Sequence, residues 1–267
     1  RPKYLTLFGS ASYVIKEKGS KKNSLVPSYQ TNQSLDPLLS YVTDDYFGLL
    51  DDKDDINNAK NIPLLDVGIG RIPVRNLEQA RRAVDKIIGY KSLAALGPWR
   101  NNITLVADDE DYNLHLDDAE AHAGLMKIEA PQFHINKIYL DAFQQESNAG
   151  GSRYPEVNKE VLQDINDGTL IWNYSGHGNN TRLAYEVVLD KDLLGQWKNE
   201  NRLPFFITAT CDFAPFDDQS QFSLGEDLFI GRSTGAIGLV TTTRLVFASS
   251  NKVMNNNFLS ALTKRNQ

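Results

Sequence analysis

One cysteine and one glycine-flanked histidine are the residues of this sequence best suited to chemistry. His177 stands between two glycines, and Cys211, the single cysteine of the chain, follows it 34 positions later. A thiol beside an imidazole is the minimal equipment for nucleophilic catalysis, because the imidazole takes the thiol proton and leaves the reactive thiolate. These two residues are the leading catalytic candidates, provided that the fold brings them together.

Each candidate follows a short apolar run of strand length. Residues 170–174 lead into the segment with His177, and residues 205–210 lead directly into Cys211. Apolar runs bounded by turn signals are typical of strands buried on both faces, and residues 190–198 between them predict a crossover helix. Parallel strands joined in this way end at the same edge of a sheet. We therefore expect His177 and Cys211 to face each other across one cleft.

The glycines beside His177 fit the same interpretation. Gly176 and Gly178 permit backbone angles that residues with a Cβ avoid, and they let a substrate backbone come close. The amides of Gly178 and Cys211 are candidates for the oxyanion-binding donors. Taken singly, His177 is better interpreted as a surface residue of a glycine-rich turn, and Cys211 as a buried structural cysteine. It is the pair, each member ending a strand, that favours catalysis.

Two longer words of sequence resemble a known family. Asn-Tyr-Ser-Gly-His-Gly (173–178) and Thr-Ala-Thr-Cys-Asp-Phe (208–213) are similar to the gingipain family, within the caspase, legumain and gingipain clan of cysteine peptidases. Other stretches resemble the branch of this family that acts as the sortase of type IX secretion: residues 43–48, 66–74, 106–109 and 241–244. Ser10-Ala11-Ser12 departs from the family, which usually carries acidic residues there.

The resemblance implies both a fold and an activity. The fold would be α/β, caspase- and gingipain-like, with a mostly parallel sheet, helices on both faces and two α/β subdomains. The activity would be that of a cysteine endopeptidase that needs no cofactor for catalysis and cleaves C-terminal sorting domains from secreted proteins. Transfer of the acyl group to a surface amine is an alternative to hydrolysis. The implied partners are outer-membrane type IX secretion components, and the implied location is the surface or outer membrane of a Gram-negative bacterium.

Composition limits the other classes of function. The chain has 267 residues, of which 41% are hydrophobic and 23% charged, and this is ordinary for a globular protein. Its net charge of −6 argues against a nucleic-acid partner. No apolar run approaches the roughly 18 residues of a membrane span. The first residues are no secretory signal and lead straight into a strand-like run, so we expect a piece of a longer chain.

The alternation of apolar runs and amphipathic segments predicts two regions, 1–97 and 98–267, divided at Gly97-Pro98. In the first, we expect a buried strand over residues 4–9, another over 64–69, and a helix from the capping residue Asn76 to about residue 93. The apolar face of this helix is predicted to comprise Leu77, Ala80, Val84, Ile87 and Ile88. In the second region, further strands are expected at 103–107, 135–140 and 235–241, and helices at 117–127, 155–167 and 252–262.

Acidic residues supply a third catalytic candidate. Asp108 follows the strand predicted at 103–107, so its carboxylate is expected to hold one imidazole nitrogen of His177 and leave the other for the thiol. Asp109, Glu110 and Asp111 are adjacent, and a solvated or calcium-binding loop is the alternative interpretation. Residues 51–55, Asp-Asp-Lys-Asp-Asp, are a second candidate for structural calcium, although a solvated turn is favoured there.

The remaining candidates concern substrate binding. Asp212 and Phe213 follow the nucleophile in a loop of the kind that shapes specificity pockets. By resemblance, Phe247 lies where gingipains place an aromatic pocket wall, with core packing as the alternative. Arg244 either binds substrate or forms a structural ion pair with Asp212 or Asp217, and the ion pair is favoured.

No catalytic metal site is expected. His115 and His122 are two helical turns apart, too far for two ligands of one zinc ion, and no His-Glu-x-x-His motif occurs. We interpret them, with His134, as ordinary surface or partly buried residues. Two rival functions stay open: a catalytically silent binding module with the same fold, and a metal-dependent hydrolase that uses His115, His122 and the acidic loops.

Overall fold

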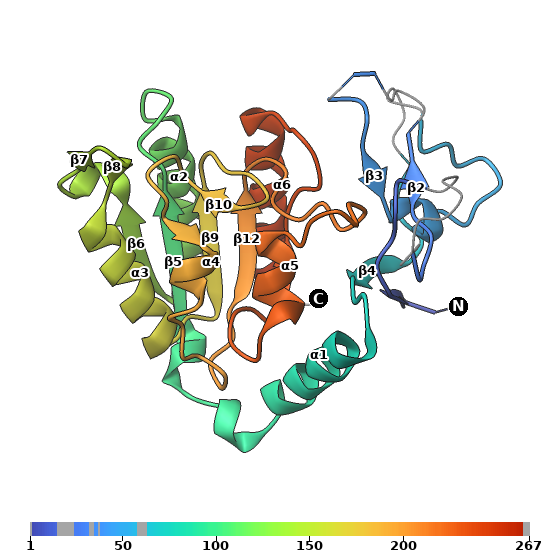
Figure 1. Cartoon of the computed structure of the whole chain (residues 1–267), viewed down its shortest axis with the longest axis horizontal. Coiled ribbons are helices and arrows are strands. Elements are labelled where there is room, and N and C mark those ends of the chain that lie inside the picture. The colour runs from blue at the N-terminus through green and yellow to red at the C-terminus, as the bar shows by residue number, and fades with distance from the viewer. Residues whose placement is uncertain (1, 15–23, 32–34, 37, 58–62, 264–267) are drawn as a thin grey trace.

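Five parallel strands form the central sheet of the computed structural model, which describes residues 2–14, 24–31, 35–36, 38–57 and 63–263. Every neighbouring pair in this sheet is parallel, which confirms the expected α/β architecture (Figure 1). In spatial order the strands are β13 (Gly238–Val240), β12 (Phe205–Ala209), β9 (Ile171–Ser175), β5 (Asn102–Ala107) and β6 (His134–Tyr139).

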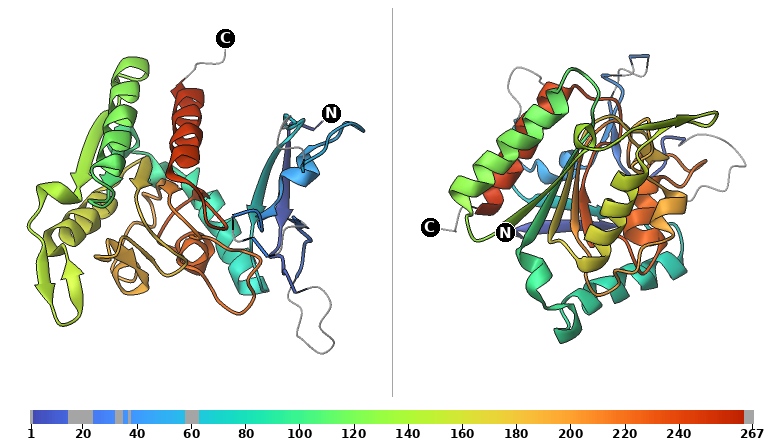
Figure 2. Two further views of the ribbon diagram at one scale, coloured as in Figure 1. Left: turned by 90° about the horizontal axis from the view of Figure 1, so that it is seen from above. Right: turned by 90° about the vertical axis from the view of Figure 1, so that its left-hand side faces the viewer.

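Helices cover both faces of this sheet. On one face, α2 (Leu114–Glu129) and α6 (Ala248–Thr263) lie side by side (Figure 2, right). On the other lie α3 (Pro155–Asp167), the short α4 (Lys191–Leu194), and α5 (Leu224–Glu226), which continues into the π-helix η5 (Asp227–Gly231). Alternate side chains of β9 and β12 enter the two cores: Trp172 and Phe206 face α3, whereas Ile171 and Ile207 face α2 and α6.

Short elements connect these layers. The predicted crossover helix at 190–198 is only the four-residue α4, because Asp190 caps its first turn and a turn at Gly195 ends it. The remaining elements after residue 97 are η3 (Pro98–Asn101), η4 (Leu140–Ala142), the hairpin β7 (Glu146–Asn148) and β8 (Gly151–Arg153), and the pair β10 (Arg182–Leu183) and β11 (Leu189–Asp190).

The first 97 residues form smaller sheets beside this layered unit (Figure 1). They are the parallel pair β1 (Tyr4–Phe8) and β4 (Gly68–Ile72), the antiparallel pair β2 (Tyr29–Gln30) and β3 (Val42–Thr43), and the turn η1 (Asp45–Gly48). The strand predicted at 4–9 exists but is not buried: Leu7 is its one buried residue, and Tyr4 is 81% exposed. The strand predicted at 64–69 starts later, at Gly68.

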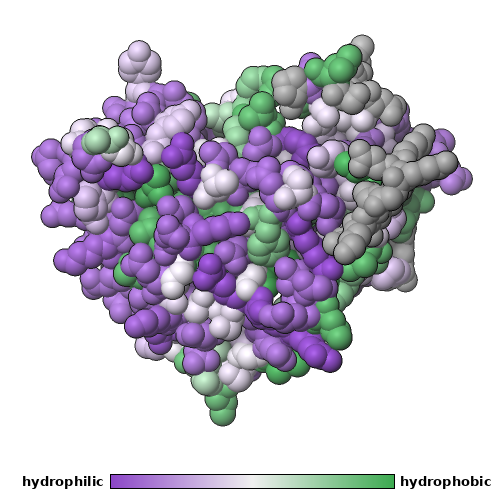
Figure 3. Space-filling model, in the orientation of Figure 1, coloured by the Kyte–Doolittle hydropathy of each residue, from purple (hydrophilic) through white to green (hydrophobic). Residues whose placement is uncertain are grey.

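Helix α1 (Leu77–Tyr90), followed by η2 (Leu93–Ala95), buries a different face from the one predicted, except that Ala80 is partly buried against a small apolar cluster. Asn76 does cap it, by accepting a hydrogen bond from the amide of Gln79. However, Leu77 and Ile88 of the expected apolar face are 64% and 65% exposed. Helix α1 lies at the lower edge of the molecule in Figure 1, and Figure 3 shows apolar surface there.

The buried face of α1 instead carries Ala83 and Lys86. Lys86 Nζ donates hydrogen bonds to the carbonyl oxygens of Phe229 (2.8 Å) and Thr234 (2.9 Å), at and after η5. Burial lowers the pKa of Lys86 to about 7. The carbonyl groups at the end of η5 need donors, and this requirement orients the helix more strongly than its apolar stripe does.

Candidate active site

The register of β9 and β12 brings the two leading candidates to the same edge of the sheet. Ser175 pairs with Ala209, and His177 and Cys211 each lie two residues beyond that pair. Cys211 is half-buried, and its Sγ lies 3.7 Å from the carbonyl oxygen of Val246. Among the described residues no hydrogen bond joins Sγ to the imidazole of His177. The strand ends thus bring His177 and Cys211 to one edge of the sheet, where the thiol lies against a backbone carbonyl.

Asp108 contacts the backbone of His177 and not its ring, so the predicted contact is wrong. Its fully buried carboxylate accepts a hydrogen bond from the His177 amide at 2.8 Å. The hydroxyl of Tyr174 lies 3.2 Å from the same oxygen and donates to the carbonyl oxygen of His177 at 2.7 Å. Burial raises the pKa of Asp108 to about 6, against the opposing effect of the His177 amide. Asp108 and Tyr174 therefore fix the backbone that carries the imidazole.

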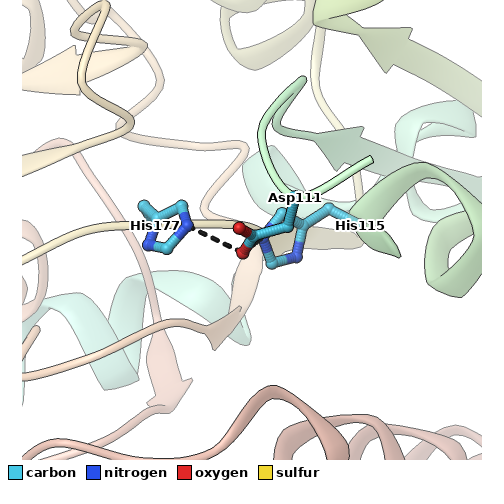
Figure 4. Close-up of side chains that lie close together, drawn as sticks. All are labelled: Asp111, His115 and His177. Atoms are coloured by element: carbon cyan, nitrogen blue, oxygen red, sulfur yellow. Dashed lines mark hydrogen bonds and ion pairs between the residues drawn. The ribbon is translucent and has the colours of Figure 1, made fainter. Parts of the chain in front are cut away.

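The carboxylate that meets the imidazole belongs to Asp111. Its Oδ2 lies 2.9 Å from Nε2 of His177 (Figure 4). A carboxylate accepts hydrogen bonds, so this contact selects the imidazole tautomer with the proton on Nε2. Nδ1 is then the nitrogen able to accept a proton from a thiol. Asp111 thus has the orienting role that was predicted for Asp108.

The loop before α2 is bent so that Asp111 can reach the ring. Asp111, Tyr112 and Asn113 have positive φ angles of 60°, 53° and 67°. Aspartate and asparagine tolerate this left-handed region, whereas tyrosine adopts it only under strain. The bend also places Asp111 next to His115, whose Nε2 lies 3.4 Å from the same Oδ2. The His115 and His177 rings meet edge to face, with centroids 5.4 Å apart.

Close packing, and not an unusual backbone angle, explains the glycines. Neither Gly176 nor Gly178 has a positive φ, contrary to the expectation. A Cβ on Gly178 would lie 2.6 Å from Oγ1 of Thr210, and one on Gly176 would overlap Asp108 and the Tyr174 hydroxyl. Glycine is required at both positions because the His177 loop lies against its neighbours.

The backbone amides of Gly178 and Cys211 donate no hydrogen bond to any described residue. Both are thus available to a ligand. Their role as oxyanion donors stays a prediction.

Arg244 forms the expected structural ion pair, and its partner is Asp217. The guanidinium donates to both carboxylate oxygens, at 3.0 and 2.6 Å, and Asp217 is fully buried. A bidentate pair of this kind fixes the orientation of the arginine. Arg244 and Asp212 also line a pocket of about 380 Å³ at this edge of the sheet, with Tyr13, Asn179, Asn180, Pro215 and Asp218.

The two aromatic candidates, Phe213 and Phe247, differ in their exposure. Phe213 is wrong as a substrate-binding residue, because it is fully buried in the core that faces α3. Asp212 has a φ of +46°, and this local twist sends the next side chain, Phe213, inward. Phe247 is 62% exposed, and its pocket role stays a prediction. Tyr185 was missed: its exposed ring lies 5.3 Å from that of His177.

Two of the three remaining histidines are more buried than predicted. His115 is 5% exposed and His122 1% exposed, whereas His134 is exposed. Asp111 and His115 were missed as neighbours of the catalytic candidates. Their separation of one helical turn was the available signal, but only the bend of the loop brings them to His177.

The chain matches a known protein family and is similar in fold to solved structures. The model of Peptidase family C25 matches residues 1–267. The crystal structure of the Arg-specific cysteine proteinase gingipain R superposes with a TM-score of 0.72 and 18% identity, over 97% of this chain and 53% of that one. The complex of Porphyromonas gingivalis RgpB pro- and mature domains gives 0.68 and 18%, over 100% and 55%.

At this identity the two structures establish the likeness of fold. The chain spans about half the length of each of them. A comparison with curated proteins gives no match.

Proposed function

Because the chain belongs to peptidase family C25, a family of cysteine peptidases, we propose that it is a cysteine endopeptidase that uses Cys211 and His177. One observation carries this proposal. In-register strands bring the single cysteine and the glycine-flanked histidine to one edge of the sheet, and the carboxylate of Asp111 contacts Nε2 of that histidine.

In the proposed reaction, the thiolate of Cys211 attacks the carbonyl carbon of a peptide. His177 accepts the thiol proton on Nδ1 and passes it to the leaving amine. Asp111 stabilises the imidazolium that forms in between, since it accepts a hydrogen bond from the Nε2–H group throughout. The amides of Gly178 and Cys211 would hold the oxyanion. Water then hydrolyses the thioester. This chemistry needs a thiol and an imidazole and no cofactor.

The pocket beside the nucleophile supports a preference among substrates. Asp212 and Asp218 contribute negative charge to its lining, while the positive charge of Arg244 is already paired with Asp217. We expect this pocket to favour a basic or polar side chain, with Phe247 and Tyr185 as exposed apolar surfaces nearby. Gingipain R, which shares the fold, is an Arg-specific proteinase. A peptide library that varies the residue before the scissile bond would test the preference here.

The biological substrate is the finer part of the proposal. The motifs that resemble the type IX secretion sortase PorU support a role in cutting C-terminal sorting domains from secreted proteins. The partners would be outer-membrane type IX secretion components, at the surface of a Gram-negative bacterium. Within the described residues, no helix is long and apolar enough to cross a membrane. Transfer to a surface amine would compete with hydrolysis only where that amine is held close to the thioester.

Structural calcium is a further part of the proposal. The carboxylates of Asp108, Asp109 and Glu186 lie within 4.8 Å of one another. Buried oxygens of Asp109 and Glu186 lack a hydrogen-bond partner among the described residues, and carboxylate oxygens suit calcium. A thermal melt with and without calcium would test this. Glu186→Gln should remove any stabilisation, and Glu160→Gln, on an exposed part of α3, should keep it.

The proposed function is tested with a peptide acyloxymethyl ketone, which alkylates an activated thiol. Mass spectrometry should locate the adduct on Cys211, and a casein digest should show endoproteolysis by the same preparation. A folded protein that cleaves no substrate and leaves the probe unreacted would instead be a silent binding module.

A further inference from the structure

Three metal-binding side chains meet at the catalytic histidine. Oδ2 of Asp111 lies 2.9 Å from Nε2 of His177 and 3.4 Å from Nε2 of His115. All three donor atoms lie within 4.8 Å of one another. Figure 4 shows the two rings on either side of the carboxylate, on chain segments from β9 and α2. No metal site was expected from the sequence because His115 was paired there with His122, which is not part of this cluster.

His115 has no other function visible in the structure. Its side chain is more than nine-tenths buried, and its Nε2 makes no hydrogen bond among the described residues, since the 3.4 Å contact with Asp111 lacks hydrogen-bond geometry. A buried ring nitrogen without a hydrogen bond is unfavourable. This nitrogen faces the Asp111 carboxylate, so the position is suited to a ligand that the carboxylate shares.

The donor set and its spacing fit zinc. Zinc in proteins takes imidazole nitrogen and carboxylate oxygen at about 2.0–2.2 Å, usually with tetrahedral geometry. Tetrahedral bonds of that length put neighbouring donors about 3.3 Å apart, close to the observed 2.9 and 3.4 Å. Two histidines and one carboxylate would leave a fourth position for water or a thiolate.

We propose that Asp111, His115 and His177 form a zinc site that switches the peptidase off. This rests on the proposed function, in which Nδ1 of His177 must accept the thiol proton. Zinc would bind Nε2, where the ring proton sits in the free enzyme. The neutral imidazole then keeps its one proton on Nδ1, so that nitrogen no longer accepts one. The thiol of Cys211 stays protonated, and attack on the substrate stops.

Binding is tested apart from activity, in Cys211→Ala protein, where the thiol cannot contribute. Zinc is titrated by calorimetry, and cobalt serves as a spectroscopic probe of tetrahedral coordination. We expect one metal per chain. His115→Gln in this background should weaken zinc at least about tenfold, as the loss of a ligand or its support does. His134→Gln, a change of an exposed histidine outside the cluster, should leave the affinity within about twofold.

Inhibition is then measured in protein with Cys211 intact. His115→Gln should raise the zinc concentration needed for half-inhibition by the same factor of about ten. If His115→Gln fails to fold, Asp111→Ala, in a half-exposed loop, replaces it in the binding experiment.

Equal zinc affinity with and without His115, or zinc activation of turnover, would overturn the proposal. A protein that binds zinc through His115 but cleaves nothing would refute the peptidase function and leave the metal site standing.

Discussion

The strands in residues 1–97 and those in residues 98–267 differ in how far their side chains are buried. In the second region, all five residues of β9 are buried, and helices cover both faces of the five-stranded sheet. In the first, β1 pairs with β4 alone among the strands that the structure describes, and four of its five residues are exposed. The apolar stripe of α1 is exposed too. A parallel strand that is covered on both faces holds the residues at its end in a fixed place, and the proposed chemistry lies wholly in the covered region.

The largest effect is expected from the nucleophile. Cys211→Ala should lower turnover by on the order of 10⁴-fold or more, because no other thiol is present. Stability should change by less than about 0.5 kcal/mol, since the site is half-buried and makes one weak contact. Initial rates and a urea denaturation curve would measure the two quantities. Full activity in a folded Cys211→Ala protein would end the cysteine-peptidase account.

The contrast between the two regions is sharpened by one pair of truncations. Phe206→Ala removes a fully buried ring from the core of the sheet and should cost about 3–5 kcal/mol of unfolding free energy. Leu77→Ala removes an exposed side chain from α1 and should cost no more than about 0.5 kcal/mol. Urea denaturation would compare them. A cost above about 1 kcal/mol for Leu77→Ala would mean that the α1 stripe is covered in solution.

Asp108 and Asp111 make different contacts with His177, so their substitutions should lower kcat by different factors. Asp111→Asn removes the charge that orients the imidazole and should lower kcat by about 10- to 100-fold. Asp108→Asn keeps an acceptor for the His177 amide and should lower kcat less than about tenfold. Steady-state rates on one peptide would rank the variants, with Asp109→Asn alongside. A greater loss at Asp108 than at Asp111 would restore the ring contact that was predicted for Asp108.

The last prediction is a change of stability with pH at Asp108. Its folded pKa of about 6 exceeds the ordinary value near 4, so between these values the native state binds the proton more tightly than the unfolded chain. Its contribution therefore favours folding below about pH 4 and is lost as pH rises through 6. Asp108→Asn cannot titrate and should be more stable than the parent at pH 7.5, by up to about 3 kcal/mol. Thermal melts of the parent and of Asp108→Asn at pH 7.5 and near pH 4 would measure this difference, which should disappear near pH 4.

Features that neighbouring residues determine were predicted from the sequence, whereas features that depend on residues far along the chain were not. Helix α3 has the bounds that were predicted, because Pro155 and Gly168 are local start and stop signals. The strand runs before His177 and Cys211 were placed correctly for the same reason. The orientation of α1 was wrong because it depends on carbonyl groups near Thr234, far along the chain. Asp111 was missed because three successive positive φ angles, which no local pattern demands, carry it to His177.

The central claim is that His177 activates Cys211, and thiol alkylation tests it most directly. The rate of iodoacetamide labelling of Cys211 is measured from pH 5 to 9 in the parent and in His177→Ala, with mass spectrometry to identify the site. The account predicts that the parent is labelled rapidly at pH 6.5, because His177 takes up the thiol proton and leaves the reactive thiolate. It also predicts that His177→Ala is labelled at least about tenfold more slowly at that pH. Identical profiles for the two proteins would show that imidazole and thiol do not act as a pair.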